Sequence, residues 1–281
     1  MHCYVINLPT ATKRLERTKI ELATYCPKLS WSVPPMFVAS EMSDEQFAEL
    51  YDPEMAWSLH HYELSQGEIA CALSHQSALR EFLKTLDDSC LIVEDDVLFS
   101  PATGGFIDGL RSWMSKRGEK PTCVILSEAA AVRYWTARRW IGEIRRTRPI
   151  DIYGAIAYVV NRAGAELILK ANALPMQTTS DHWSFYRRQG LSVFGVDNFL
   201  AGSFDFSRAD SSLSAGRLEM YRKSCMKHPV CESFLQRKAK AIASYARRLW
   251  WRMTGVDTKG EVRTNVGLYR ACDRLTECSN D

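Results

Sequence analysis

Short apolar runs alternate with amphipathic segments along roughly the first 200 residues of the chain. The runs lie at residues 3–8, 36–39, 90–93, 121–126, 155–160 and 191–196, and they predict buried strands. Strands that are apolar throughout are typical of a mostly parallel sheet with helices on both faces. The pattern therefore predicts an α/β protein.

The segments between the runs carry helical periodicity. The clearest is 65–86, where Ser65 and Glu68 have the spacing of a capping box and an apolar residue recurs every three or four positions. Further helices are predicted at 11–25 with Thr10 or Thr12 as cap, at 105–114, at 161–171 with Asn161 as N-cap, and at 180–190 before Gly190.

The alternating pattern ends near residue 205, which predicts a folded domain over 1–205 and a separate segment over 206–281. Residues 217–252 hold ten Lys or Arg and two Glu, a net charge of +8, whereas the whole chain carries +3. On a helix, residues 234–253 gather Phe, Leu and Trp on one side. This basic, helical segment is expected to bind an anionic membrane surface. The alternative is a helix packed on the folded domain.

Composition is that of an ordinary globular protein, with 46% apolar and 25% charged residues. No apolar run is long enough for a membrane-spanning helix, and no signal peptide is visible at the start. The nine cysteines include no C-x-x-C pair, so Cys71, Cys90 and Cys123 are interpreted as reduced core thiols. The expected location is cytoplasmic, free or peripheral on the inner membrane.

Three acids, Glu94, Asp95 and Asp96, directly follow the apolar run 90–93. Ligands of open α/β sheets bind beyond the carboxyl ends of strands, and carboxylates there suit Mg²⁺ or Mn²⁺ together with phosphate oxygens. Strand alternation would direct Glu94 and Asp96 to one side and Asp95 to the other. The alternative is a solvated acidic loop that caps a helix.

Four motifs occur in the order INL, GEIACALSH, LIVEDDV and AYVVNRAGAELIL. Together they resemble glycosyltransferase family 25, the sugar transferases of lipopolysaccharide and lipooligosaccharide, over about residues 1–205. The resemblance implies a GT-A-like fold and inverting transfer of a hexose, most often galactose, from a UDP-sugar to a lipid-linked oligosaccharide. One departure is Phe37–Ser40, where the family often has Asp-Gly.

The resemblance also implies roles for individual residues. Asp96 and Glu94 would hold Mn²⁺ or Mg²⁺, because the acidic triplet replaces a DxD motif. The nucleotide-sugar would be contacted by Asn7, Leu8, Arg14, Glu94 and Asp95. Surface salt bridges are the alternative for Arg14.

Sugar transfer also needs a general base for the acceptor hydroxyl. Asp181 is the first candidate and Glu68 the second, although helix capping explains either residue. The expected substrate-binding residues are His75, Glu128, His182 and Trp183, with Trp183 stacking on a sugar. Packing in the core is the alternative for His75 and Trp183, and a plain loop position is the alternative for Glu128.

Two rival functions use the same features. A phosphoryl-transfer enzyme also places acids at strand ends, but the chain has no G-x-G-x-x-G or P-loop motif. A non-enzymatic adaptor would use the basic segment on a membrane or on nucleic acid. Because no RNA- or DNA-binding signature is visible, nucleic acid is not an expected partner.

Overall fold

The computed structural model describes residues 1–60, 62–128, 131–133, 138–142, 144–147, 149–151, 154–196, 199–204, 220 and 256–257. The helices are α1 (Thr12–Tyr25), the 3₁₀ helix η1 (Ala39–Glu41), α2 (Asp44–Leu50), α3 (Pro53–His60), α4 (Gln66–Leu83), α5 (Thr103–Ser115), α6 (Arg162–Ala171) and α7 (Trp183–Arg188). The strands are β1 (Cys3–Ile6), β2 (Trp31–Ser32), β3 (Ser89–Glu94), β4 (Val97–Phe99), β5 (Thr122–Glu128), β6 (Ala131–Arg133), β7 (Arg138–Ile141), β8 (Ile144–Thr147), β9 (Pro149–Asp151), β10 (Ala157–Asn161), β11 (Ser192–Val196), β12 (Ala201–Ser203) and β13 (Val256–Asp257).

The main sheet has the strand order β2-β1-β3-β10-β5-β11-β8-β7, and β12 joins β5 to β4. Strands β1, β2, β3, β5, β7, β11 and β12 run in one direction, whereas β4, β8 and β10 run in the other. The predicted α/β class with a mostly parallel sheet is therefore confirmed. A smaller sheet pairs β6 with β9 and β13.

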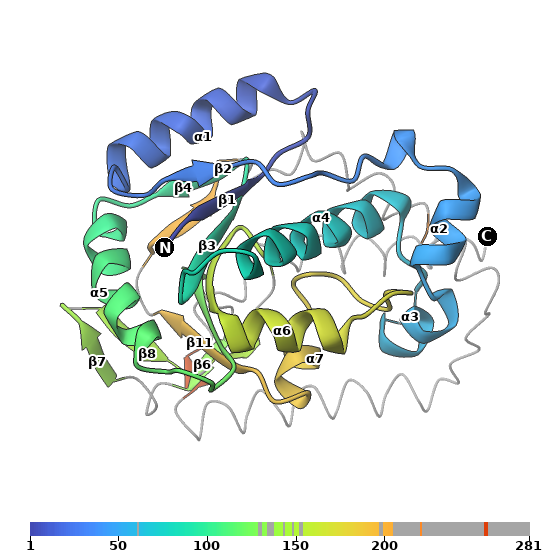
Figure 1. The fold of residues 1–281 in the computed structure, drawn as a ribbon. Coiled ribbons are helices and arrows are strands. Elements are labelled where there is room, and N and C mark those ends of the chain that lie inside the picture. Colours follow the sequence, from blue (N-terminus) through green and yellow to red (C-terminus); the bar gives the residue numbers. More distant parts are fainter. Residues whose placement is uncertain are drawn as a thin grey trace, which may run out of the picture.

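Helices cover both faces of the sheet (Figure 1). On one face α1 and α5 pack over the strand residues Val5, Leu91 and Val93. On the other face α4, α6 and α7 pack over a second cluster that includes Tyr4 and Ile92. Because neighbouring residues of β1 and β3 enter opposite clusters, both faces are apolar, and this produces the continuous apolar runs in the sequence.

Helix α4 is buried along most of its length. Its predicted capping box is present: the Glu68 amide donates to Ser65 Oγ (3.3 Å), and the Ser65 amide donates to Glu68 Oε2 (3.0 Å). The helix packs against β1, β3 and α6. These contacts hold its middle turns, with Cys71 and His75, at a fixed place beside the sheet.

Some predicted elements are wrong. Residues 36–39 form no strand, because the Phe37 amide donates to Ser74 Oγ of α4 (3.0 Å) and a 3₁₀ turn follows. The strand beside β1 is instead the short β2. The cap of α1 is Ala11 without a side-chain hydrogen bond, rather than Thr10 or Thr12.

The last predicted helix is shorter than expected and begins at Trp183. The predicted basic helical segment over 206–281 lies outside the described residues, apart from 220 and 256–257. Among the helices that are described, none combines the length and the apolarity needed to cross a membrane.

Candidate active site

The candidate site lies at the edge of the sheet where β1, β3 and β5 end. Asn7 follows β1, the acidic triplet ends β3, and Glu128 ends β5. Strand β10 runs antiparallel to β3, so it begins at this same edge, with Ala157 opposite Val93. The Glu94 amide donates to the Ile156 carbonyl (2.8 Å). Residues 154–156 are thereby held next to the triplet.

Asp95 is buried and anchors the turn after β3. Its carboxylate accepts a hydrogen bond from Asn7 Nδ2 (2.7 Å) and pairs with Arg14 (2.5 Å). Its carbonyl oxygen accepts from Thr18 Oγ1 (2.9 Å). Burial raises the pKa of Asp95, while the Arg14 charge and the Asn7 hydrogen bond oppose that rise. Asp95 thus contacts both Asn7 and Arg14, the two other residues at this turn that are predicted to contact the nucleotide.

Asp96 points toward β12. Its Oδ2 accepts a short hydrogen bond from Ser203 Oγ (2.5 Å), and its carbonyl accepts from the Phe204 amide (3.0 Å). The other carboxylate oxygen, Oδ1, is buried and has no hydrogen-bond partner among the described residues. Burial, and then the negative charge of Glu94, raise the pKa of Asp96 to about 6. A buried carboxylate oxygen without a donor is a position that a cation would stabilise.

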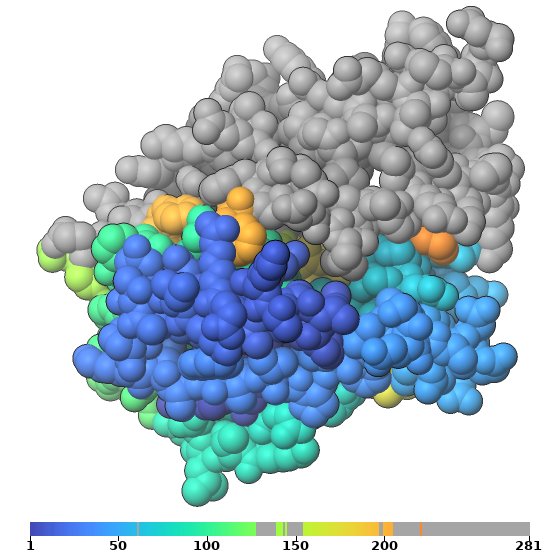
Figure 2. Space-filling model, turned by 90° about the horizontal axis from the view of Figure 1, so that it is seen from above, coloured from blue at the N-terminus to red at the C-terminus, as the bar shows by residue number. Residues whose placement is uncertain are grey.

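The segment that carries Ser203 also borders α1. Arg17 of α1 lies over the ring of Phe204, with 3.9 Å from its guanidinium carbon to the ring centroid. Figure 2 shows residues 199–204 (golden, at the left) beside the blue surface of the N-terminal part of the chain. Arg17 is therefore engaged with an aromatic ring at the border of the site.

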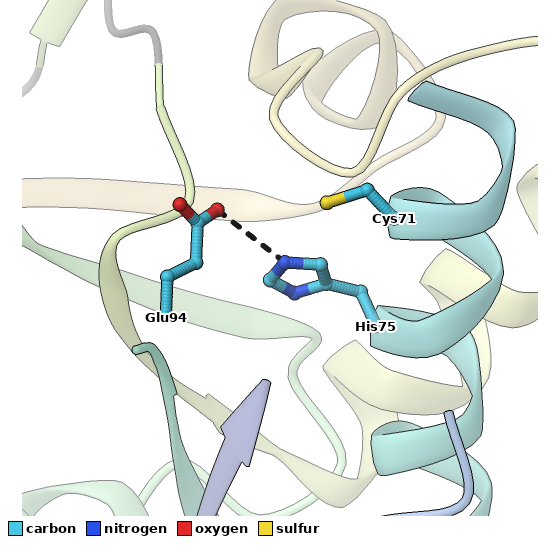
Figure 3. Close-up of side chains that lie close together, drawn as sticks. All are labelled: Cys71, His75 and Glu94. Atoms are coloured by element: carbon cyan, nitrogen blue, oxygen red, sulfur yellow. Dashed lines mark ion pairs between the residues drawn. The ribbon is translucent and has the colours of Figure 1, made fainter. Parts of the chain in front are cut away.

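Glu94 turns toward α4 (Figure 3). Its Oε1 lies 3.5 Å from His75 Nε2, and Cys71, one turn earlier on α4, points into the same space. Ligand atoms of Cys71, His75 and Glu94 all lie within 4.8 Å of one another. Glu94 therefore belongs to the acidic triplet in the sequence, while its side chain lies beside helix α4.

A chain of contacts links His75 to Asp181. His75 Nδ1 lies 3.1 Å from the hydroxyl of Tyr158, and the Tyr158 ring meets Trp183 edge-on. The indole of Trp183 donates to the Gly154 carbonyl (3.1 Å), and the Gly154 amide donates to Asp181 Oδ2 (3.0 Å). Asp181 is therefore connected through Gly154, Trp183 and Tyr158 to His75, which lies beside Glu94.

Other candidates have structural roles. The indole of Trp183 is 2% exposed, so its ring belongs to the core, as the alternative interpretation held. Glu68 is 2% exposed and accepts hydrogen bonds from Ser65 and from the Tyr62 hydroxyl. The Leu8 carbonyl accepts from the Ala11 amide at the start of α1 (2.8 Å).

His182 belongs to a cluster beside the site. Its Nδ1 lies 2.7 Å from Thr178 Oγ1, which also contacts His60 Nε2 (2.9 Å). Burial, and then the neighbouring His60, lower the pKa of His182 to about 4. A neutral ring is therefore favoured at neutral pH. The backbone of Glu128 ends β5 at the site edge, and its side chain lies outside the described residues.

Sequence reasoning missed three contributors to the site. Tyr158 and Ser203 approach His75 and Asp96 through long-range folding, and nothing near them in the chain indicates this. The apolar run around Cys71 predicts a core thiol, yet Cys71 is half-buried beside His75. The available signal was the C-x₃-H spacing on a helix, which places both side chains on one face.

Comparison with known proteins gives one family match. The model of "Glycosyltransferase family 25 (LPS biosynthesis protein)" matches residues 1–183. No curated protein matches the chain.

Three solved structures are similar at low identity. A197 from STIV is 12% identical (TM-score 0.37; 73% of this chain and 86% of that one). A glycosyltransferase involved in glycosylating the major capsid of PBCV-1 is 12% identical (TM-score 0.36; 80% of this chain and 100% of that one). A Bacillus anthracis protein described as a putative glucose-1-phosphate thymidylyltransferase, in complex with a sucrose, is 9% identical (TM-score 0.37; 83% of this chain and 97% of that one). Similarity at this level carries no functional argument.

Proposed function

Because the chain belongs to glycosyltransferase family 25, we propose that it moves a hexose from a UDP-sugar to a core sugar of lipooligosaccharide or lipopolysaccharide. Galactose is the expected hexose, and the transfer inverts the anomeric centre. One observation carries the proposal. Residues 154–156 lie next to the acidic triplet at one sheet edge, and within them the Gly154 amide binds the Asp181 carboxylate. Donor activation and acceptor deprotonation need acids at two separate positions of one site.

The proposed donor side uses a divalent cation. Asp96, with its buried and unpartnered Oδ1, fits a cation ligand, and Glu94 is close enough to raise the pKa of Asp96. Mn²⁺ or Mg²⁺ suits this pair of carboxylates, and when bound it would neutralise charge on the departing diphosphate. Asp95 is already paired with Arg14, so its proposed role is to hold the turn that presents Asp96.

The proposed base is Asp181. Its Oδ2 accepts from the Gly154 amide, while Oδ1 has no hydrogen bond to any described residue. The first contact fixes the carboxylate, and the second oxygen can accept the proton of an acceptor hydroxyl. His75 and His182 are proposed to line the sugar side of the site.

The proposed acceptor is lipid-linked, which requires the enzyme to reach a membrane surface. The net charge of +8 over residues 217–252 supports electrostatic attraction to anionic lipid. In the alternative function, a non-enzymatic adaptor, the same basic segment binds the membrane and the protein catalyses no reaction. It predicts binding to vesicles and no turnover of any UDP-sugar.

Release of UDP from a panel of UDP-sugars with Mn²⁺, with and without core oligosaccharide, tests the proposal. Asp96→Asn should abolish transfer, and its matched control is Asp108→Asn, which removes an exposed acid paired with Lys28. Full activity of the wild-type enzyme after exhaustive EDTA treatment would refute the metal requirement. Activity of Asp96→Asn equal to that of the control would do the same.

Asp181→Asn tests the base separately. Asparagine retains an oxygen for the Gly154 amide, so the fold should persist while turnover falls about a hundredfold to ten-thousandfold. Glu68→Gln is the comparison, because glutamine also completes a capping box. A loss of less than about tenfold for Asp181→Asn, with a large loss for Glu68→Gln, would transfer the role to Glu68.

A further inference from the structure

We propose that Cys71, His75 and Glu94 form a binding site for a zinc-class divalent cation, which shares Glu94 with the oxygen-ligand site at Asp96 but differs from it in its sulfur and nitrogen ligands. The three ligand atoms lie within 4.8 Å of one another and converge from α4 and the end of β3 (Figure 3). The inference rests on these contacts and on the burial of His75, and it does not depend on the proposed sugar transfer.

The scaffold holds the ligands close together. Cys71 and His75 are four residues apart on α4 and therefore share a helix face, while Glu94 approaches from the strand that α4 covers. Ligands of a tetrahedral zinc ion with bonds of about 2.0–2.3 Å stand about 3.5 Å apart. The distances between the ligand atoms reach that value when the side chains of Cys71 and Glu94 rotate so that their ligand atoms move by about 1 Å. Both side chains are half-buried.

His75 provides independent evidence for a ligand. It is 2% exposed, and its buried Nε2 has no hydrogen-bond partner in the part of the chain that the structure describes. The 3.5 Å separation from Glu94 Oε1 is longer than an ordinary hydrogen bond. The other ring nitrogen, Nδ1, lies 3.1 Å from the Tyr158 hydroxyl. When Nδ1 carries the proton, Nε2 presents a lone pair to the space between Cys71 and Glu94, as metal-ligating histidines do.

The ligand types select the ion. A thiolate, an imidazole and a carboxylate suit Zn²⁺ or Co²⁺, whereas Mg²⁺ and Mn²⁺ prefer oxygen ligands alone. Three protein ligands leave one tetrahedral position for water or a ligand oxygen. The partial exposure of Cys71 and Glu94 gives an ion access to the buried imidazole.

Cobalt absorption tests the site with a readout other than activity. Full-length protein, reduced and stripped with EDTA, is titrated with Co²⁺. We expect a thiolate-to-cobalt charge-transfer band and tetrahedral d–d bands that saturate at a single equivalent and disappear on adding Zn²⁺. Cys71→Ser should remove the charge-transfer band. His75→Gln and Glu94→Gln should weaken Co²⁺ binding at least about tenfold.

Two control variants make the result specific. Cys26→Ser removes a thiol that packs in the core cluster on the other face of the sheet, and it should keep the full spectrum. Asp96→Asn should also keep it, which separates this site from the proposed catalytic cation. Circular dichroism checks each fold, and Glu94→Gln serves if Cys71→Ser does not fold. The absence of a charge-transfer band, its persistence in Cys71→Ser, or unchanged Co²⁺ binding in Glu94→Gln would overturn the proposal.

Discussion

The ion pair between Arg14 and Asp95 offers a test of how the acidic turn is held. Arg14→Met keeps most of the side-chain volume and removes the positive charge. Asp95 would then be buried with only Asn7 and no counter-charge. Since Arg14 is the largest influence that lowers the pKa of Asp95, its loss should raise that pKa further. The free energy of unfolding should fall.

The size of the effect follows from exposure. Two unit charges 4 Å apart interact by about 4 kcal/mol at an effective dielectric constant of 20. The side chain of Arg14 is 32% exposed and that of Asp95 is 10% exposed, so solvent screens part of this energy. About 2 kcal/mol remains, between the 0–1 kcal/mol of surface pairs and the 3–5 kcal/mol lost when a fully buried pair is broken.

Urea unfolding of four proteins measures this energy: the wild type, Arg14→Met, Asp95→Asn and the double variant. The double variant has no unpaired charge, so it should lose about 1–2 kcal/mol less than the sum of the single losses. Losses that add to within about 0.5 kcal/mol would show that the pair is not coupled and would refute the reasoning.

Three further outcomes are expected. Because the unfolded chain protonates His182 below about pH 6.5 and the folded chain only near pH 4, stability should fall as pH drops from 6.5 to 4. Urea unfolding should show a smaller fall for His182→Gln, and an equal fall would contradict the assignment. Gly104→Ala places a methyl group 2.1 Å from the Tyr25 carbonyl, so thermal unfolding should show a loss of about 1–3 kcal/mol. Gly105→Ala, with open space around it, is the control. Full-length protein should float with anionic vesicles at low salt, and a chain ending at residue 216 should not. If neither protein floats with the vesicles, membrane binding is refuted.

Much of the fold could be predicted because its signals are local. The capping box of α4 and the Asn161 cap of α6 lie within four residues of the groups they bind. The direction of β10 could not be predicted, since an apolar strand has the same pattern in either orientation. Residues 36–39 failed as a strand because Ser74, far along the chain, takes the Phe37 amide.

Less of the site could be predicted. Chain position put the three acids at a strand end, but their directions depend on distant partners. Asp95 meets Asn7 and Arg14, Asp96 meets Ser203, and Glu94 approaches His75. Strand alternation gave no guide to these directions, because β3 ends at Glu94 and the next two residues form a turn.

The antiparallel course of β10 has a consequence for how such proteins diversify. Chain segment 129–156 leaves β5 and enters β10 at the same rim, so both of its ends open onto the site. Insertions at either end of the segment would change the shape of the rim while β3, β5 and β10 keep their register. Within this segment β8 pairs with β11, through Thr147 and Gly195. This pairing limits which part of the segment can change in length. The middle of the segment is different, because β7 and β8 belong to the main sheet and Ile144 lies in its core, so only the two ends can change in length without disturbing the packing.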